Sequence, residues 1–118
     1  MGQFKFTHWL AYWYFRTESF EFDWDTGNST KSNFKHGIES NEVESIFELK
    51  FGIPIGIQIS PVVKEDRFCI IGLSRKGKLL SIVFTIRNEK IRPISSRLAS
   101  KKERDLYEKI RKTNKSLR

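Results

Sequence analysis

The sequence has 118 residues, of which 38% are hydrophobic and 31% are charged, and it contains ten Phe, three Trp and three Tyr. This length and composition indicate one folded domain with an aromatic core, and they exclude a second core or a disordered chain. The net charge of +8 is uneven, because residues 1–50 carry 5 basic and 8 acidic side chains whereas residues 51–118 carry 17 and 6. A basic surface of this kind is typical of proteins that bind nucleic acid or an acidic partner protein.

An aromatic segment, residues 1–19, opens the chain. Its apolar run from Trp9 to Phe15 is too short to cross a bilayer, which takes about 20 helical residues, and it lacks a signal-peptide cleavage site. The segment is either a short helix or strand packed on the domain or a flexible extension. The lone Cys69 cannot form an internal disulfide and predicts a buried thiol in a reducing compartment. We therefore expect a cytoplasmic protein without membrane contact.

Alternating aromatic and acidic residues over 20–24 predict a half-buried strand. Asp25 is a suitable N-cap for a helix that runs to Lys35 and ends at Gly37. A second helix is expected to begin at Asn41, because Glu44 follows three residues later as in a capping box. Gly52 and Pro54 are then expected to end it.

From Ile55 the apolar residues alternate with the period of strands. Strands are predicted over residues 55–59, 67–74, 78–87 and 90–95, and the last two are joined by a two-residue turn at Asn88 and Glu89. The S-K-K-E sequence from Ser100 to Glu103 then predicts a capping box and a final helix. The predicted fold is α+β: an antiparallel or mixed sheet of about four strands, with helices packed on it. Residues 20–112 would form one domain and residues 113–118 a flexible basic tail.

Metal and cofactor chemistry find little support in the sequence. His8, His36 and Cys69 are the only histidines and the only cysteine, and they show no ligand spacing. The phosphate-loop, dinucleotide and G-x-S-x-G motifs are absent from the sequence. We expect no metal site and no cofactor.

Four basic side chains occur within the predicted hairpin of residues 84–97, namely Arg87, Lys90, Arg92 and Arg97. A two-residue turn would pair Arg87 with Lys90 and Thr85 with Arg92, so that these four side chains, three of them cations, share one face of the sheet. Their repulsion would be relieved by a bound anion such as RNA phosphate. The alternative is that the long stems cover apolar surface while the charged heads stay in water.

Cleavage of RNA without a metal requires few groups, because the ribose 2′-OH can attack the adjacent phosphate. The enzyme must hold the reacting atoms in line and stabilise the charge that develops on the phosphoryl oxygens. Arginine suits this task, since its planar guanidinium donates two hydrogen bonds to a phosphate and remains charged.

Six motifs in one order resemble the BrnT family of toxins over about residues 20–108. They are F-E-F-D-W-D-x-G-N-x-x-K at 20–31, K-H-G-I at 35–38, E-V-E-S-I-F at 42–47, E-D-R-F-C-I-I-G at 65–72, I-R-P-I-S-S-R at 91–97 and K-K-E-R-D-L-Y-E at 101–108. The resemblance implies a RelE-like fold and a metal-independent ribonuclease toxin that arrests translation. It also implies a BrnA-like antitoxin as partner, in a 2:2 complex that binds operator DNA through the antitoxin.

The resemblance also assigns roles to residues of this chain. The implied catalytic residues are Arg97, Arg92, Arg87 and His36, and the implied RNA-binding residues are Lys35, Arg67, Arg75, Lys90 and Ser95. Asn28 and Ser32 depart from the residues of many relatives, so we assign them no role. Pro93 removes one backbone N–H and indicates an edge strand or a bulge.

Several of these residues have structural alternatives. His36 precedes Gly37 and could satisfy the last carbonyls of a helix, as could Lys35, whereas Arg67 could pair with Glu65 or Asp66. Strand serines such as Ser95 commonly bond to nearby backbone. For the whole protein, the alternative function is a non-catalytic basic α+β module that binds an acidic protein or nucleic acid.

Overall fold

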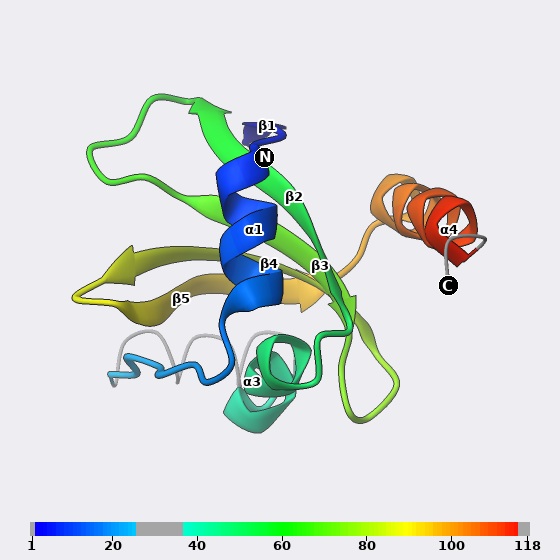
Figure 1. The fold of residues 1–118 in the computed structure, drawn as a ribbon, viewed down its shortest axis with the longest axis horizontal. Coiled ribbons are helices and arrows are strands. Elements are labelled where there is room, and N and C mark those ends of the chain that lie inside the picture. Colours follow the sequence, from blue (N-terminus) through cyan, green and yellow to red (C-terminus); the bar gives the residue numbers. More distant parts are fainter. Residues whose placement is uncertain (1, 26–36, 116–118) are drawn as a thin grey trace.

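Five strands form one antiparallel sheet in the computed structural model, which describes residues 2–25 and 37–115 (Figure 1). In spatial order the strands are β1 (Gln3–Lys5), β2 (Gly52–Ser60), β3 (Phe68–Leu73), β4 (Leu79–Arg87) and β5 (Lys90–Leu98). The helices are α1 (His8–Arg16), α3 (Ser40–Glu48) and α4 (Lys101–Lys115). The α+β prediction is confirmed, but the sheet has five strands rather than about four. The additional strand is β1, whose three residues are too few to show an alternating pattern.

The hairpin of β4 and β5 has the predicted register. Arg87 pairs with Lys90 and Thr85 with Arg92, and both turn residues, Asn88 and Glu89, have positive φ angles of 51° and 64°. Such a turn matches the right-handed twist of the strands. Further along, Phe84 pairs with Pro93 and Val83 with Ser95, so Ile94 forms a bulge in this edge strand. The expectation from Pro93 is therefore confirmed.

Residues 20–24 do not form the predicted strand. Phe22 makes one isolated parallel bridge to Ile91, where the Ile91 N–H donates to the Glu21 carbonyl and the Asp23 N–H to the Ile91 carbonyl, each at 2.8 Å. The alternation was still informative, because Phe20, Phe22 and Trp24 pack against the core. The segment thus covers part of the β5 edge. The helix predicted from Asp25 to Lys35 lies outside the described residues.

Helix α3 begins earlier than the sequence predicted. Its N-cap is Glu39, whose backbone N–H donates to the Glu42 carboxylate at 3.1 Å, so Glu42 replaces Glu44 as the capping-box residue. The helix ends at Glu48, before Lys50 with its φ of 59°. Gly52 and Pro54 therefore lie within β2 instead of ending the helix.

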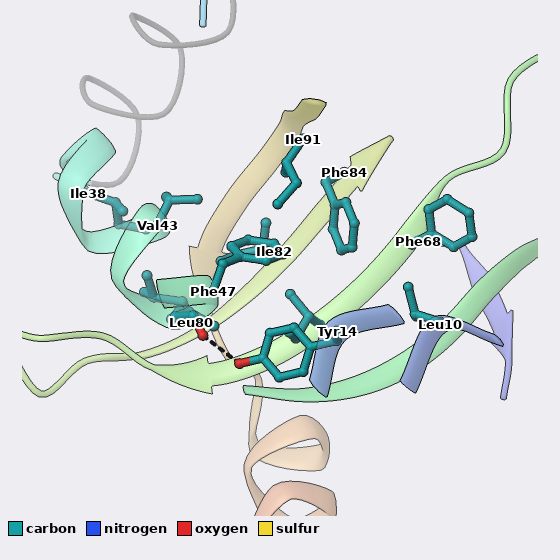
Figure 2. Packing of buried hydrophobic residues seen from close by; sticks show 12 residues of the cluster. Leu10, Tyr14, Ile38, Val43, Phe47, Phe68, Leu80, Ile82, Phe84 and Ile91 are labelled. Carbon is teal, nitrogen blue, oxygen red and sulfur yellow. Dashed lines mark hydrogen bonds between the residues drawn. The ribbon is translucent and has the colours of Figure 1, made fainter. Parts of the chain in front are cut away.

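Helices α1 and α3 cover one face of the sheet and enclose an aromatic core (Figure 2). The sequence left open whether residues 1–19 pack on the domain or form a flexible extension. In the structure α1 packs on the sheet and contributes Leu10 and Tyr14 to this core. The Tyr14 hydroxyl donates to the Ile46 carbonyl at 2.5 Å and accepts from the Gly52 N–H at 2.8 Å. Burial raises the pKa of this hydroxyl above its ordinary value. Tyr14 thereby ties α1 to both α3 and β2.

Helix α4 packs on the opposite face of the sheet. Its Tyr107 is buried with Cys69, Ile71 and Leu79 in a smaller apolar cluster. The helix starts with the capping box that the sequence predicted, since the Ser100 N–H donates to Glu103 at 2.8 Å and the Glu103 N–H to the Ser100 hydroxyl at 3.2 Å. Because α4 covers only part of this face, the remaining strand surface forms the wall of a cleft.

Candidate functional site

A cleft of about 400 Å³ lies beside α4 and extends over all five strands. The antiparallel register pairs Ser81 with Arg97 and Val83 with Ser95, so these four side chains line the same wall. Arg67 also lines the cleft, just before β3 begins. The remaining lining residues are Gly2, Phe4, Ile55, Gln58, Cys69, Ile71, Ile94, Glu103 and Leu106. Three of the residues assigned from sequence, Arg67, Ser95 and Arg97, therefore lie in one cleft.

Arg97 is held at the wall of this cleft by Glu103. Its two terminal nitrogens donate to the two carboxylate oxygens of Glu103 at 2.7 and 2.9 Å. The same carboxylate accepts from the Ser81 hydroxyl at 3.1 Å and from the Ser100 N–H at 2.8 Å. This arrangement fixes the plane of the guanidinium against the sheet.

The surroundings of Glu103 keep its carboxylate ionised. Partial burial favours the neutral acid, but the hydrogen bonds from Arg97, Ser100 and Ser81 outweigh it and hold the pKa of Glu103 below its ordinary value. The hydrogen bond to Glu103 likewise raises the pKa of Arg97. Both groups are therefore charged at neutral pH.

Sequence reasoning treated Glu103 only as a helix cap and did not identify Ser81. The S-K-K-E motif satisfied the rules for a helix start, so its carboxylate needed no further explanation. The signal that could have been used was the hairpin register, which places position 81 across from Arg97. One carboxylate thus caps α4 and orients a cleft arginine.

Arg67 lies in the cleft without an ion pair to any described residue. The alternative that Arg67 forms an ion pair with Glu65 or Asp66 is not found in the described part of the structure. Glu65 pairs with Arg87 instead. Ser95 makes no hydrogen bond through its hydroxyl to a described residue, so the backbone-bonding alternative is not found either. Both side chains can therefore bind a ligand without first breaking a side-chain hydrogen bond or ion pair within the described residues.

At the hairpin end, Arg87 and Arg92 have carboxylate partners. Arg87 donates to both oxygens of Glu65 at 2.7 and 2.9 Å. Arg92 donates to Asp25 at 2.5 Å and lies 3.7 Å from Asp23. Lys90 is exposed beside them. Arg87, Lys90 and Arg92 share a face as expected, and the bulge at Ile94 brings Arg97 onto it, but the internal ion pairs relieve much of the repulsion that had suggested a bound anion.

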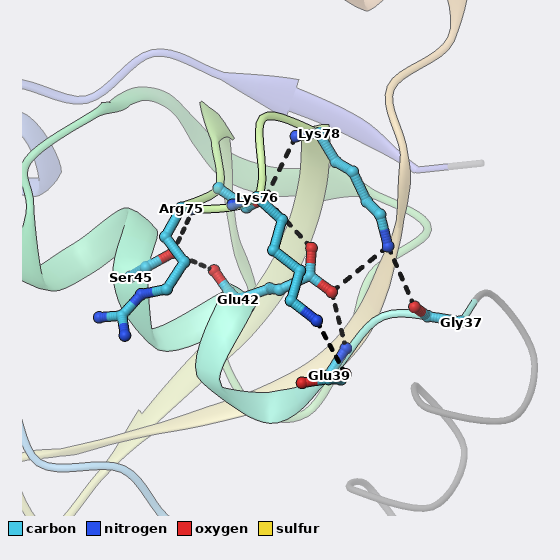
Figure 3. A network of polar contacts seen from close by, with 8 residues as sticks. Gly37, Glu39, Glu42, Ser45, Arg75, Lys76 and Lys78 are labelled. Carbon is cyan, nitrogen blue, oxygen red and sulfur yellow. Dashed lines mark hydrogen bonds and ion pairs between the residues drawn. The ribbon is translucent and has the colours of Figure 1, made fainter.

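Arg75 lies in the turn between β3 and β4, next to α3 rather than in the cleft (Figure 3). Its backbone N–H donates to the Ser45 hydroxyl at 3.0 Å. Nearby, the buried Glu42 accepts from the Ser74 hydroxyl at 3.1 Å and from Lys78 at 3.4 Å. This network connects α3 to the turn. Lys35 and His36, the other assigned residues, lie outside the described residues.

Cys69 is buried beside the polar part of the cleft. Its Sγ lies 3.8 Å from the Ser81 hydroxyl. Burial raises the pKa of the thiol to about 11, which keeps it protonated and unreactive at neutral pH. The prediction of a buried free thiol is confirmed.

Two further observations concern metals and membranes. Over residues 2–25 and 37–115, no three His, Cys, Asp or Glu side chains gather as metal ligands would. No helix within these ranges has the length and apolar character needed to span a bilayer.

Comparison with known proteins gives one family. A family model described as "Ribonuclease toxin, BrnT, of type II toxin-antitoxin system" matches residues 24–103. No curated protein was found to match the chain. The matched range contains Arg67, Ser95, Arg97 and Glu103 of the cleft, but it omits β1, α1 and most of α4.

Proposed function

The chain belongs to the BrnT family of ribonuclease toxins of type II toxin-antitoxin systems, and on this premise we propose that it cleaves RNA in the cleft beside α4 without a metal ion. The observation that supports this site most strongly is that Arg67, Ser95 and Arg97 line one cleft and all fall within the family match. The cleft volume of about 400 Å³ suits one nucleotide unit, because pockets for small ligands start at about 300 Å³.

The proposed reaction uses the substrate's own nucleophile. The 2′-oxygen bonds to the adjacent phosphorus, its proton leaves to a base, and the bond from phosphorus to the 5′-oxygen breaks as that oxygen gains a proton. The products are a 2′,3′-cyclic phosphate and a 5′-hydroxyl. Arg97 and Arg67 would stabilise the charge on the phosphoryl oxygens, and the Ser95 hydroxyl would position the phosphate or the 2′-OH.

Glu103 would act by positioning Arg97 rather than by transferring protons. Its pKa is lowered and its oxygens already accept four hydrogen bonds, both of which make it a weak base. Proton transfer by His36 remains part of the proposal, with Lys35 beside it. Arg87, Arg92 and Lys90 would contact RNA phosphates beyond the cleft, and Arg75 would do so only if RNA extended to the α3 side.

Chelation and substrate modification test this mechanism together. We expect purified protein to cleave RNA equally well with and without EDTA and to leave 2′,3′-cyclic ends. RNA with a 2′-O-methyl group at the cleavage position should resist, because the nucleophile is blocked. Loss of cleavage in EDTA, or efficient cutting of the methylated RNA, would show that the mechanism is wrong.

A specific observation favours the alternative of a basic binding module. Arg87, Arg92 and Arg97 each pair with a carboxylate, as arginines with a purely structural role do. Binding of RNA without any cleavage, under conditions where the 2′-OH is available, would support this alternative.

The family implies an antitoxin partner. We propose that this partner is BrnA-like, that it forms a 2:2 complex with the toxin, and that it binds operator DNA. We further propose a RelE-like fold and a cytoplasmic site of action, where RNA cleavage arrests translation. Induced expression without the antitoxin should stop growth, and intact RNA in the arrested cells would argue against this proposal.

A further inference from the structure

A second hollow, of about 480 Å³, lies next to the cleft, and all nine residues that line it are apolar. Phe6 and Phe15 line it at the two ends of α1, Ile53 belongs to β2, and Leu106 and Ile110 belong to α4. Phe6 is 55% exposed, Phe15 is 56% exposed and Leu106 is 39% exposed. A concentrated apolar surface of this kind, which we call the apolar groove, is typical of a protein interface.

The apolar groove is continuous with the candidate ribonuclease cleft. Phe4, Ile55 and Leu106 line both hollows. On the other side, Phe15 and Ile53 also line a smaller hollow of about 330 Å³ that includes Lys50 and Arg111. A ligand in the groove would therefore lie next to the cleft at one end and to Arg111 at the other, since the Lys50 ammonium is held by the carbonyls of Tyr14 and Thr17.

Charge decides which partner fits. Residues 101–115, which form α4, carry seven basic and three acidic side chains, and the whole chain has a net charge of +8. A second copy of this chain would bring the same positive charge to the groove, and like charges oppose association. An acidic partner would be attracted by the surface that repels a second copy.

We propose that the apolar groove is the docking site for an acidic amphipathic helix of the antitoxin. The apolar face of that helix would fill the groove, as in other helix-in-groove complexes, while its carboxylates approach Arg111 at the end of the groove. Because the groove adjoins the cleft, the bound antitoxin would also obstruct access of RNA to Arg97. The identity of the partner in this inference rests on the proposed function. The apolar groove itself lies largely outside the residues that the family model matches.

Matched substitutions of exposed aromatic residues on α1 test the proposal. Phe15→Ser removes a groove residue that is 56% exposed, whereas Tyr12→Ser removes one that is 63% exposed and does not line the groove. The probe is the full-length cognate antitoxin, with affinity measured by titration calorimetry. We expect Phe15→Ser to weaken binding about 10- to 100-fold, as for an interface hot spot. Tyr12→Ser should bind as the unsubstituted protein does.

Charge reversal provides a second test that does not disturb packing. Arg111→Glu should slow association with the antitoxin, whereas Arg104→Glu, on α4 but outside the three hollows, should have a smaller effect. RNA cleavage by Phe15→Ser and Arg111→Glu in the absence of antitoxin should match that of the unsubstituted protein. Retained cleavage combined with escape from the antitoxin would support the groove as a separate docking site.

The outcomes separate the two proposals. Unchanged antitoxin affinity in both Phe15→Ser and Arg111→Glu would overturn the docking site, even if the protein cleaves RNA. If the protein proved unable to cleave RNA, the proposed function would fail, while the affinity measurements would still decide the docking site. The chain alone could also form a dimer that Phe15→Ser abolishes while antitoxin binding stays intact. This result would identify a second copy as the occupant of the groove and would also overturn the proposal.

Discussion

The first turns of α3 and α4 use the same local device in different surroundings. In each helix a glutamate accepts a hydrogen bond from the backbone N–H three residues earlier, namely Glu42 from Glu39 and Glu103 from Ser100. Glu42 is fully buried and accepts from Ser74 and Lys78, whereas Glu103 lines a cleft and holds Arg97. A capping glutamate thus links its helix to neighbouring elements at both sites, but of the two only Glu103 holds an arginine that lines the cleft.

Substitution of the buried glutamate should have the larger effect on stability. Glu42→Ala leaves the Ser74 hydroxyl and the Glu39 N–H without their acceptor and removes one of the two acceptors of Lys78, so we expect the free energy of unfolding to fall by about 2–3 kcal/mol. Urea denaturation measures this change. Glu48→Ala, at an exposed position of the same helix, is the matched control and should change stability by less than about 0.5 kcal/mol. Equal losses in the two variants would show that the Glu42 network contributes little.

The partly buried Glu103 should have a smaller effect that appears in the pH dependence. Its pKa is lowered in the folded protein, so its contribution is present above the unfolded pKa of about 4.3 and is lost as pH falls through the folded pKa. Glu103→Gln cannot ionise. We therefore expect its free energy of unfolding at pH 7 to be about 1 kcal/mol lower, with a smaller decline on acidification than in the unsubstituted protein. If the free energy of unfolding declined equally with falling pH in the two proteins, this account would be contradicted.

The parts of the fold that could be predicted depend on interactions close in sequence. The Asn88–Glu89 turn fixes the register of β4 and β5, and Ser100 with Glu103 marks the start of α4, because neighbouring residues suffice for both. The start of α3 was mispredicted for the opposite reason. Asn41 is the better N-cap by residue type, but Glu42 finds partners on a turn more than 30 residues away. Tertiary contacts overrode the local preference.

In the candidate site, too, the features set by neighbouring residues could be predicted and those set by tertiary contacts could not. The shared face of Arg87, Lys90 and Arg92 followed from the two-residue turn and strand alternation, whereas Ser95 and Arg97 reach that face only because of the bulge at Ile94. The ion pairs of Arg87 with Glu65 and of Arg92 with Asp25 join residues 22 and 67 positions apart, so no sequence spacing indicated them. Strand β1 and the apolar groove could not be predicted because they depend on how α1 and α4 pack against β2.

The most direct test of the cleft as the ribonuclease site compares two arginines with the same kind of partner. Arg97 and Arg87 each form a two-point ion pair with a glutamate, but only Arg97 lines the cleft. The measurement is the single-turnover rate of RNA cleavage by Arg97→Ala and by Arg87→Ala, each shown to be folded by its circular dichroism spectrum. We expect Arg97→Ala to lose about 10²- to 10³-fold in rate, as for removal of a donor to a developing oxyanion, and Arg87→Ala to lose less than about 10-fold. Equal losses, or a larger loss in Arg87→Ala, would contradict the assignment of the cleft as the ribonuclease site.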